Sequence, residues 1–185
     1  MWLSVSSRVF VVAAGMASGA RGSSKLQTFL TDATTDFAVT ARKLDNKRLN
    51  KQALEAWQIM MTNLSLDPAG NYRAPKGWVS HPATKMWRGH EVALLEYISA
   101  MTDEWIARGY KTTIRDKATA TIRVAYENAL IISEEYPEWM LCETLDKLAQ
   151  THRVALLCKN YEWYSQFEWQ EDSGKAPESY EYIWA

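Results

Sequence analysis

Residues 42–57, RKLDNKRLNKQALEAW, hold five basic residues and only two carboxylates, and they predict the helix around which the rest of the chain is arranged. Asp45 is a suitable N-cap, because its short carboxylate can accept hydrogen bonds from the free N–H groups of the first turn. We therefore expect a helix over about 46–62. Apolar residues recur along it at steps of three and four, at Leu49, Ala53, Ala56, Trp57 and Met60. This face would pack against a core.

The charges of this stretch have two interpretations. Asp45 is the only acid among residues 42–51, so the segment is locally positive although the formal net charge of the chain is −1. It could be a solvated helix face with ordinary ion pairs, since Lys51 and Glu55 are spaced for one at i,i+4. It could instead bind phosphate, with a carboxylate among the cations that acts on a bound nucleic acid.

Length and composition predict one all-α domain. The chain has 185 residues and 21.2 kDa, with 47% hydrophobic and 23% charged residues, values typical of a soluble globular protein with a sizeable core. Only 8 Gly and 5 Pro interrupt long stretches of helical periodicity. We expect a single compact helical domain with three to five main helices and an irregular C-terminal tail rich in aromatic residues.

The cysteines and histidines do not form a metal-binding pattern. Cys142 and Cys158 are not accompanied by a second pair, and the three histidines are scattered at His81, His90 and His152. We therefore expect no metal site and no disulfide framework. The two cysteines are interpreted as reduced core thiols.

Residues 1–25 differ in composition from the rest and are interpreted as an N-terminal extension, with the helical domain over 26–185. They contain no acid, six Ser and three basic residues, and their apolar run is too short to span a membrane. They could be a weak secretory signal or an organelle transit peptide. Alternatively, translation begins near Leu26 and they are a gene-calling extension, which would favour the cytoplasm or nucleoid. The sequence does not decide among these.

The other expected helices follow from caps and periodicity. Thr34 or Thr35 can cap a short helix over 36–43. Residues 63–80 contain Pro68, Gly70, Pro75 and Gly77 and are expected to form a loop beside the basic helix, where a binding site is expected. Ser80 can then cap a long helix that ends at Gly109. A third long helix is expected over 115–134.

The end of the chain combines one more helical stretch with an aromatic tail. After Pro137, apolar residues recur at helical spacing as far as Leu156, and from Asn160 on the chain is rich in Trp, Tyr and acids. Such a tail is expected to close a small core. Its negative charge disfavours phosphate, so at most the edge near Trp163 and Tyr164, beside Lys159, would touch a ligand.

Six ordered segments resemble a known family. They are QTFL (27–30), LDNKRLNKQALEAWQI (44–59), GWVSHPATKMWRGHEVALLEY (77–97), EWIARGY (104–110), THRVALLCK (151–159) and YEYIW (180–184). Over 27–185 the chain resembles the pyrimidine-dimer DNA glycosylases of the phage endonuclease V type, in a branch named by similarity. The resemblance implies a single helical domain without cofactor that binds double-stranded DNA, here expected as a monomer. It also implies displacement of the base opposite a UV-induced dimer and cleavage of the glycosidic bond.

The resemblance also suggests catalytic groups. In the family the chain's own α-amine is the nucleophile, a Glu stabilises the sugar cation and assists the imine steps, and β-elimination then cuts the strand. The family spacing of two Leu and this Glu is matched by Leu44, Leu49 and Glu55, so Glu55 is the expected catalytic acid. The matching amine would belong to Gln27, or to an initiator Met in place of Leu26. Both require a chain that starts there, because the written chain starts at Met1.

Two further departures concern the nucleophile and the DNA contact. Lys25 could replace the amine only if its pKa were lowered. The Arg that precedes the Glu in the phage enzyme is Leu54 here.

Further polar residues are expected to contact DNA around the same cleft. His81 could instead cap a helix or pack, and His152 could be a core histidine. The DNA-binding candidates are Arg42, Lys43, Lys47, Arg48, Lys51, Gln52, His81, Lys85, Arg88, His152, Arg153 and Lys159.

The leading functional interpretation is an enzyme, a DNA-repair glycosylase with associated AP-lyase activity on pyrimidine-dimer duplex DNA. Two alternatives remain: a non-catalytic DNA-binding module of the same fold, and a structural helical interaction domain.

Overall fold

The structure is a computed structural model that describes residues 10–11, 27–131 and 133–185, and in these ranges the fold is all-α, as predicted. The expected N-terminal extension, apart from Phe10 and Val11, lies outside the described residues. The described α-helices are α1 Phe37–Lys43, α2 Asn46–Leu64, α3 Pro82–Met86, α4 Glu91–Ala107, α5 Ile114–Glu127, α6 Thr144–Lys159 and α7 Tyr161–Tyr164. Two short strands, β1 (Phe10–Val11) and β2 (Ile183–Trp184), pair antiparallel.

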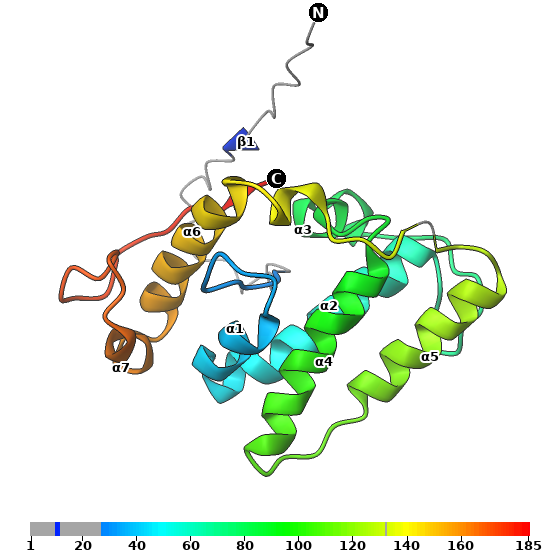
Figure 1. Ribbon diagram of the computed structural model, residues 1–185, viewed down its shortest axis with the longest axis horizontal. Coiled ribbons are helices and arrows are strands. Elements are labelled where there is room, and N and C mark those ends of the chain that lie inside the picture. The colour runs from blue at the N-terminus through cyan, green and yellow to red at the C-terminus, as the bar shows by residue number, and fades with distance from the viewer. Residues whose placement is uncertain (1–9, 12–26, 132) are drawn as a thin grey trace, which may run out of the picture.

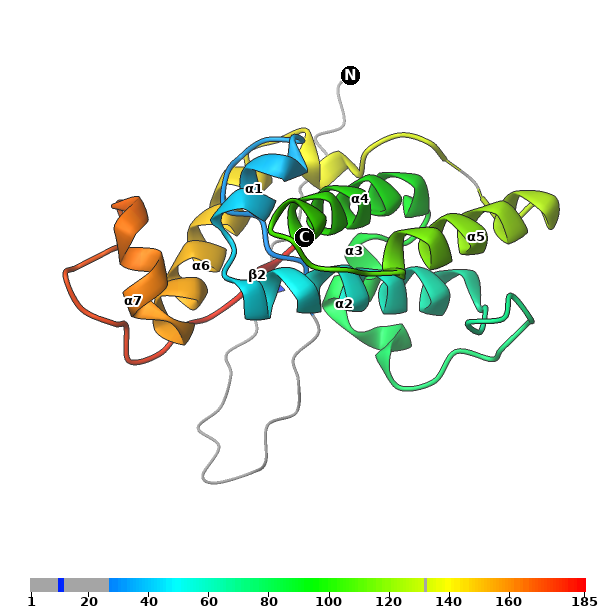
Figure 2. The same cartoon turned by 90° about the horizontal axis from the view of Figure 1, so that it is seen from below.

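The helices pack around α2. Helix α4 lies along α2, α5 flanks both, and α1 packs on α4 (Figure 1). Helices α6 and α7 lie on the other side of α1, and the C-terminal strand returns beside α6 (Figures 1 and 2). The apolar face predicted for α2 is buried, and Leu49, Ala56 and Met60 have no exposed surface. This packing fixes the direction in which the polar face of α2 points.

Helix α2 begins where the sequence predicts. Asp45 is its N-cap, and the Oδ1 of Asp45 accepts a hydrogen bond of 2.8 Å from the backbone N–H of Arg48. The helix ends two residues later than expected, at Leu64, because Ser65 adopts the left-handed conformation with φ of 56°. A hydrogen bond joins α2 to α5: the indole N–H of Trp57 donates to the Thr121 hydroxyl over 3.1 Å.

Two of the predicted helices differ in the structure. The long helix after Ser80 is divided into α3 and α4, because Gly89 has a φ of +83° that ends the helical path. The cap is His81 rather than Ser80: its Nδ1 accepts from the N–H of Ala83 over 3.2 Å. Helix α5 stops at Glu127, seven residues before the predicted end, since Ala129 follows in a left-handed conformation.

A smaller correction concerns α1. It is capped by Asp36, whose carboxylate accepts from the N–H of Ala38, and not by Thr34 or Thr35.

The aromatic tail closes the N-terminal end of α2. Tyr164 is fully buried, stacks near Trp169, and accepts a hydrogen bond of 3.1 Å from the backbone N–H of Asp45. Tyr164 is therefore not at a ligand-facing edge, which corrects that expectation, because the ring fills the space beside the cap. Trp163 stays partly exposed and donates to the Lys43 carbonyl over 2.8 Å.

The cysteines also depart from expectation. Cys142 is exposed on the turn before α6, and Cys158 is only partly buried, so the prediction of two core thiols is wrong. Among the described residues, no three His, Cys, Asp or Glu side chains lie close enough to share a metal ion. None of the described helices is both long and apolar enough to cross a bilayer.

Candidate active site

The segment 27–31 is buried against side chains of four helices, α1, α2, α4 and α6. It belongs to no sheet, so its backbone groups need other partners. The N–H of Phe29 donates to Gln52 Oε1 on α2 over 2.7 Å, and the carbonyl of Phe29 accepts from the Tyr97 hydroxyl on α4 over 2.9 Å. The Tyr97 hydroxyl also lies 2.7 Å from Gln52 Oε1. Side chains of α2 and α4 thus replace the neighbouring strand that an extended segment usually has.

Helix α6 and helix α1 hold the rest of this segment. His152 Nδ1 accepts from the N–H of Leu30 over 3.0 Å, and Arg153 donates to the Thr31 carbonyl over 2.9 Å. The N–H of Thr31 donates to the Thr40 hydroxyl over 2.9 Å. The position of residue 27 is therefore set by four helices at once.

This arrangement places the nitrogen of residue 27 beside Glu55. The backbone N of Gln27 lies 3.4 Å from Glu55 Oε2, although the two residues are 28 positions apart. Both are buried, at 3% and 4% exposure. The two catalytic candidates from the sequence are thus in contact in the structure.

Glu55 is a buried carboxylate with partial compensation. Burial raises its pKa above the ordinary value, while the charge and hydrogen bond of Lys51, the N–H of Gln27 and the charge of Lys159 act in the opposite direction. Lys51 Nζ lies 3.2 Å from Glu55 Oε1 and is about half exposed. A carboxylate held in this way can stabilise a nearby cation or accept a proton.

His152 contributes to the site as a neutral side chain. Burial lowers its pKa to about 3, with the neighbouring charge of Arg153 acting in the same direction. Since Nδ1 accepts from Leu30, the ring proton is on Nε2, which contacts the Gln27 carboxamide. In the structure the amide nitrogen of Gln27 faces this ring nitrogen, and the amide oxygen has no partner among the described residues; a flip of the carboxamide would let the oxygen accept from the Nε2–H. His152 therefore orients Gln27 and does not act as a cation.

Two of the predicted DNA-binding residues are internal. Gln52 and His152 are 1% and 2% exposed, and both use their polar atoms on the segment 27–31. This corrects their expected role, because a side chain sealed under this segment presents no atom to a duplex. The alternative interpretation of His152 as a core histidine is confirmed, and both side chains have the chain itself as their partner.

Three more of the predicted cations are held in internal ion pairs. Lys43 lies 2.7 Å from Asp32, Arg48 lies 2.5 Å from Asp45, and Arg153 lies 2.6 Å from Glu171. Arg48 also donates to the Lys159 carbonyl over 3.0 Å. These cations hold segments together and have limited capacity for phosphate.

Other candidates remain available near Glu55. Lys47 is exposed one turn before Lys51 on α2. The ammonium of Lys159 lies 4.4 Å from the centre of the Tyr180 ring, at the surface. Together with Lys51 they form a positive rim on the side of the site.

Lys85, Arg88 and His81 lie farther along the surface. Lys85 and Arg88 line a separate cleft of about 430 Å³ that also includes Ala185. His81 caps α3, and its ring lies between those of Trp78 and Trp184. Burial lowers the pKa of His81.

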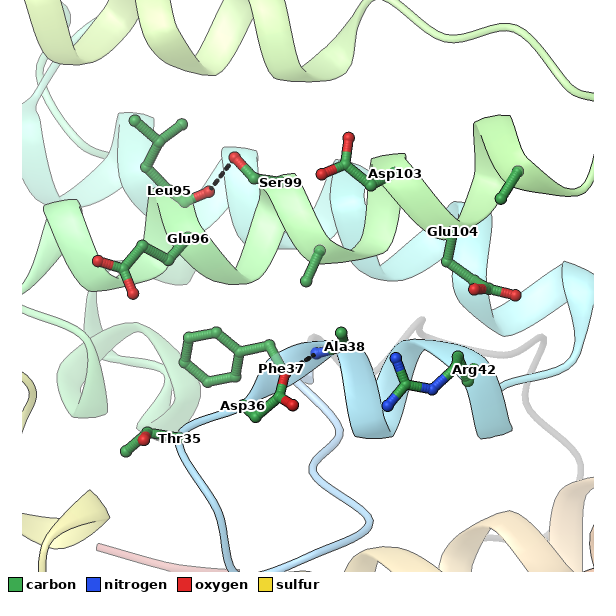
Figure 3. Close-up of a pocket in the computed structure, with 12 residues that line it drawn as sticks. Thr35, Asp36, Phe37, Ala38, Arg42, Leu95, Glu96, Ser99, Asp103 and Glu104 are labelled. Atoms are coloured by element: carbon green, nitrogen blue, oxygen red, sulfur yellow. Dashed lines mark hydrogen bonds between the residues drawn. The ribbon is translucent and has the colours of Figure 1, made fainter.

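Arg42 points away from the site, into a groove between α1 and α4. Figure 3 shows it across from Glu104, with Glu96 and Asp103 farther along α4. The groove has a volume of about 630 Å³ and also includes Asp36. Asp103 and Glu104 are paired with Arg115 and Arg108, which leaves Asp36 and Glu96 beside Arg42, so the charge around the groove remains negative and disfavours a phosphate.

Sequence reasoning missed the role of Tyr97 and Tyr182. Tyr97 is fully buried, and a buried tyrosine needs a partner for its hydroxyl. That need was the signal that could have revealed its contact with Phe29. Tyr182 packs against the rings of Phe29 and His152 and covers them from the tail.

Comparison with known proteins places this helical domain in a class of DNA-repair proteins. The family model described as pyrimidine dimer DNA glycosylase matches residues 26–118, half of the chain, and the range includes both Gln27 and Glu55. The chain belongs to this family. No curated protein and no solved structure matched it. Membership implies DNA as the substrate, and α6 with the tail lies outside the matched range.

Proposed function

We propose that this protein is a DNA glycosylase with associated AP-lyase activity, acting on duplex DNA that contains pyrimidine dimers. The observation that carries the proposal is the 3.4 Å separation of the Gln27 nitrogen and Glu55 Oε2. In a chain that starts at residue 27, this nitrogen is the α-amine. Such an amine has an unperturbed pKa of roughly 7.7–8.0, so a useful fraction is neutral near pH 7.

The chemistry proceeds in two stages. The neutral amine attacks C1′ of the damaged nucleotide and the C1′–N bond breaks, with its electron pair leaving on the base. Glu55 stabilises the positive charge that develops on the sugar. Loss of a proton and opening of the sugar ring give an imine between the amine and C1′. Glu55 then accepts a proton from C2′, and the 3′ phosphate leaves by β-elimination.

The electrostatics of the site support these roles. Lys51, 3.2 Å from Glu55, favours the ionised carboxylate that both stages require. Lys47 and Lys159 provide positive charge near the same rim for the DNA backbone. The buried contacts of the segment 27–31 hold the amine in place before substrate arrives, which lowers the entropic cost of reaction.

Borohydride trapping on UV-irradiated duplex DNA tests the proposal. We would compare the full chain, a version starting with Met at position 26 and a version starting at Gln27. A fourth version, with two glycines before Gln27, is the matched control because it moves the amine away from Glu55. We expect an adduct on the N-terminal peptide of one or both short versions, and little from the full chain or the glycine control.

A second function is favoured by one feature of the chain as written. Its residue 27 nitrogen is a peptide nitrogen, which cannot form an imine. DNA binding that falls steeply with salt, without an adduct from any version, would identify a non-catalytic DNA-binding module. Absence of DNA binding at low salt would contradict both functions and point to a structural domain.

A further inference from the structure

The loop between α2 and α3 is held in a defined shape. Leu66 and Tyr72 form an antiparallel bridge, and the N–H of Arg73 donates to the Ser65 carbonyl over 2.8 Å. Asp67 accepts from the N–H groups of Ala69 and Asn71 over 2.8 and 2.9 Å. The main chain of Arg73 is therefore held next to the end of α2.

The same turn is packed against the helical body. Gly70 has a φ of +85°, and a Cβ built there would lie 3.1 Å from a methyl carbon of Val124 on α5. A turn this close to α5 has little freedom to swing. The loop extends past the C-terminal end of α2 (Figure 2).

The loop carries two exposed cations. Residues 71–77 are all exposed, and they include Arg73 and Lys76. Among the described residues, neither side chain forms an ion pair with a carboxylate. Asp67, the only acid of the loop, is occupied by backbone N–H groups, which lower its pKa although burial opposes this. The loop is thus a positive surface without internal compensation.

Arg73 and Lys76 lie next to the end of the α2 face that carries Glu55. Lys51, Glu55, Gln58 and Thr62 follow one another at three- and four-residue steps, so they share one face of the helix. Gln58 and Thr62 line a small cleft of about 190 Å³ with Arg73 and Lys76. The positive charge of the loop therefore lies at the far end of the same face as the candidate site.

A row of aromatic rings also connects the loop with the site. Trp78 lies against His81 at 5.1 Å between ring centres, His81 against Trp184 at 5.6 Å, and Trp184 against Tyr182 at 5.5 Å. Tyr182 in turn contacts His152, which orients Gln27. Two independent paths, one along α2 and one along these rings, connect the loop with the site around Glu55.

We propose that the loop 71–77 is a second DNA-binding element, in which Arg73 and Lys76 neutralise phosphates of the duplex that lies over Glu55. This inference rests on the proposed function and names the surface that extends it. The regularly spaced phosphates of a duplex fit this surface, because the two cations line a cleft on a positively charged face. Together with Lys47 and Lys51 the loop makes contacts at both ends of α2.

The test uses the full chain and a short duplex, with and without a pyrimidine dimer. The affinity is measured by fluorescence anisotropy over a range of salt concentrations. We expect Arg73→Ala/Lys76→Ala to weaken binding at least about tenfold near 0.1 M salt and to reduce the slope of log K against log salt by about 2. Because both side chains are exposed, the variant should fold, and its far-UV circular dichroism checks this.

Lys147→Ala/Lys175→Ala is the matched control, with the same loss of charge. Both side chains are exposed, and among the described residues neither forms an ion pair with a carboxylate. Lys147 lies five residues before His152 on α6, on another face of that helix, and the segment after α7 that carries Lys175 lies at the opposite end of the molecule from the loop (Figure 2). The control should bind like the unaltered chain.

A third variant separates the loop from the function itself. If Lys47→Ala/Lys51→Ala loses affinity while the loop variant and the control do not, the loop proposal is overturned and the proposed function stands. If the control loses as much as the loop variant, the effect is one of net charge and the loop proposal is again overturned. Failure of the unaltered chain to bind DNA overturns both proposals.

Discussion

Two buried glutamates in different regions of the domain show what distinguishes a candidate catalytic acid. Glu55 and Glu91 are 4% and 3% exposed, and burial raises the pKa of both. Glu91 accepts from the N–H of Gly89 over 2.9 Å, a neighbour two residues away, at the start of α4. Glu55 accepts from Gln27, which belongs to a distant segment, and from Lys51. Burial alone is therefore no sign of catalysis, whereas the origin of the partner is informative.

The largest expected difference between the two concerns base excision. In a chain that starts at residue 26 or 27, Glu55→Gln should reduce release of the damaged base by at least about 100-fold, because proton transfer and charge stabilisation are both lost. Glu91→Gln should retain most of the activity. Single-turnover excision from dimer-containing duplex measures both, with DNA affinity as the control. Equal losses of excision activity in the two variants would contradict a catalytic role that belongs to Glu55 and not to Glu91.

A smaller effect concerns the segment that brings Gln27 to Glu55. Gln52→Ala leaves the Phe29 N–H without its acceptor and removes one partner of Tyr97, so unfolding should become easier by roughly 1–3 kcal/mol. Gln58→Ala, on the outer face of the same helix, is the matched control and should change little. Urea unfolding followed by circular dichroism compares them. A neutral Gln52→Ala would mean that this segment is not held as described.

The smallest expected effect is on stability as a function of pH, and here the two glutamates should behave alike. Each has a folded pKa above its unfolded value near 4.5, so its favourable contribution is present at low pH and is lost as the pH rises through the folded pKa. Glu55→Gln and Glu91→Gln should therefore each raise the melting temperature at pH 7, and the gain should disappear toward pH 4. A loss of stability in Glu55→Gln at pH 7 would contradict this.

For His152, the expected dependence of stability on pH has the opposite sign. Its folded pKa of about 3 lies below the ordinary 6.5, so its contribution is present above pH 6.5 and is lost as the pH falls toward 3. Thermal unfolding of His152→Gln should show a weaker decline over that window than the unaltered chain. An unchanged decline in thermal stability would mean that groups other than His152 cause it.

The elements that local signals specify could be predicted from the sequence. The Asp45 cap, the apolar face of α2 and the position of Glu55 all depend on residues within one helix. The break between α3 and α4 was missed, because the apolar pattern continues across Gly89 and only its backbone conformation ends the helix. Helical periodicity describes side chains and does not register such an interruption.

The inward role of several polar residues could not be predicted. Gln52 and His152 lie at helical positions that are equally compatible with an outer and an inner face, and their partners are 23 and 122 residues away in sequence. Only the packing of α2 and of α6 against the segment 27–31 decides between these faces. The same holds for Arg153, whose ion pair with Glu171 depends on where the tail returns.

The way the segment 27–31 is held has a consequence for how this site can change over evolutionary time. Gln52, Tyr97 and His152 contact its main chain at Phe29 and Leu30, and Glu55 contacts the main-chain nitrogen of residue 27. Main-chain atoms are common to all residues except proline, whose nitrogen lacks the hydrogen. Residue 27 can thus be exchanged for another type while its nitrogen keeps its place.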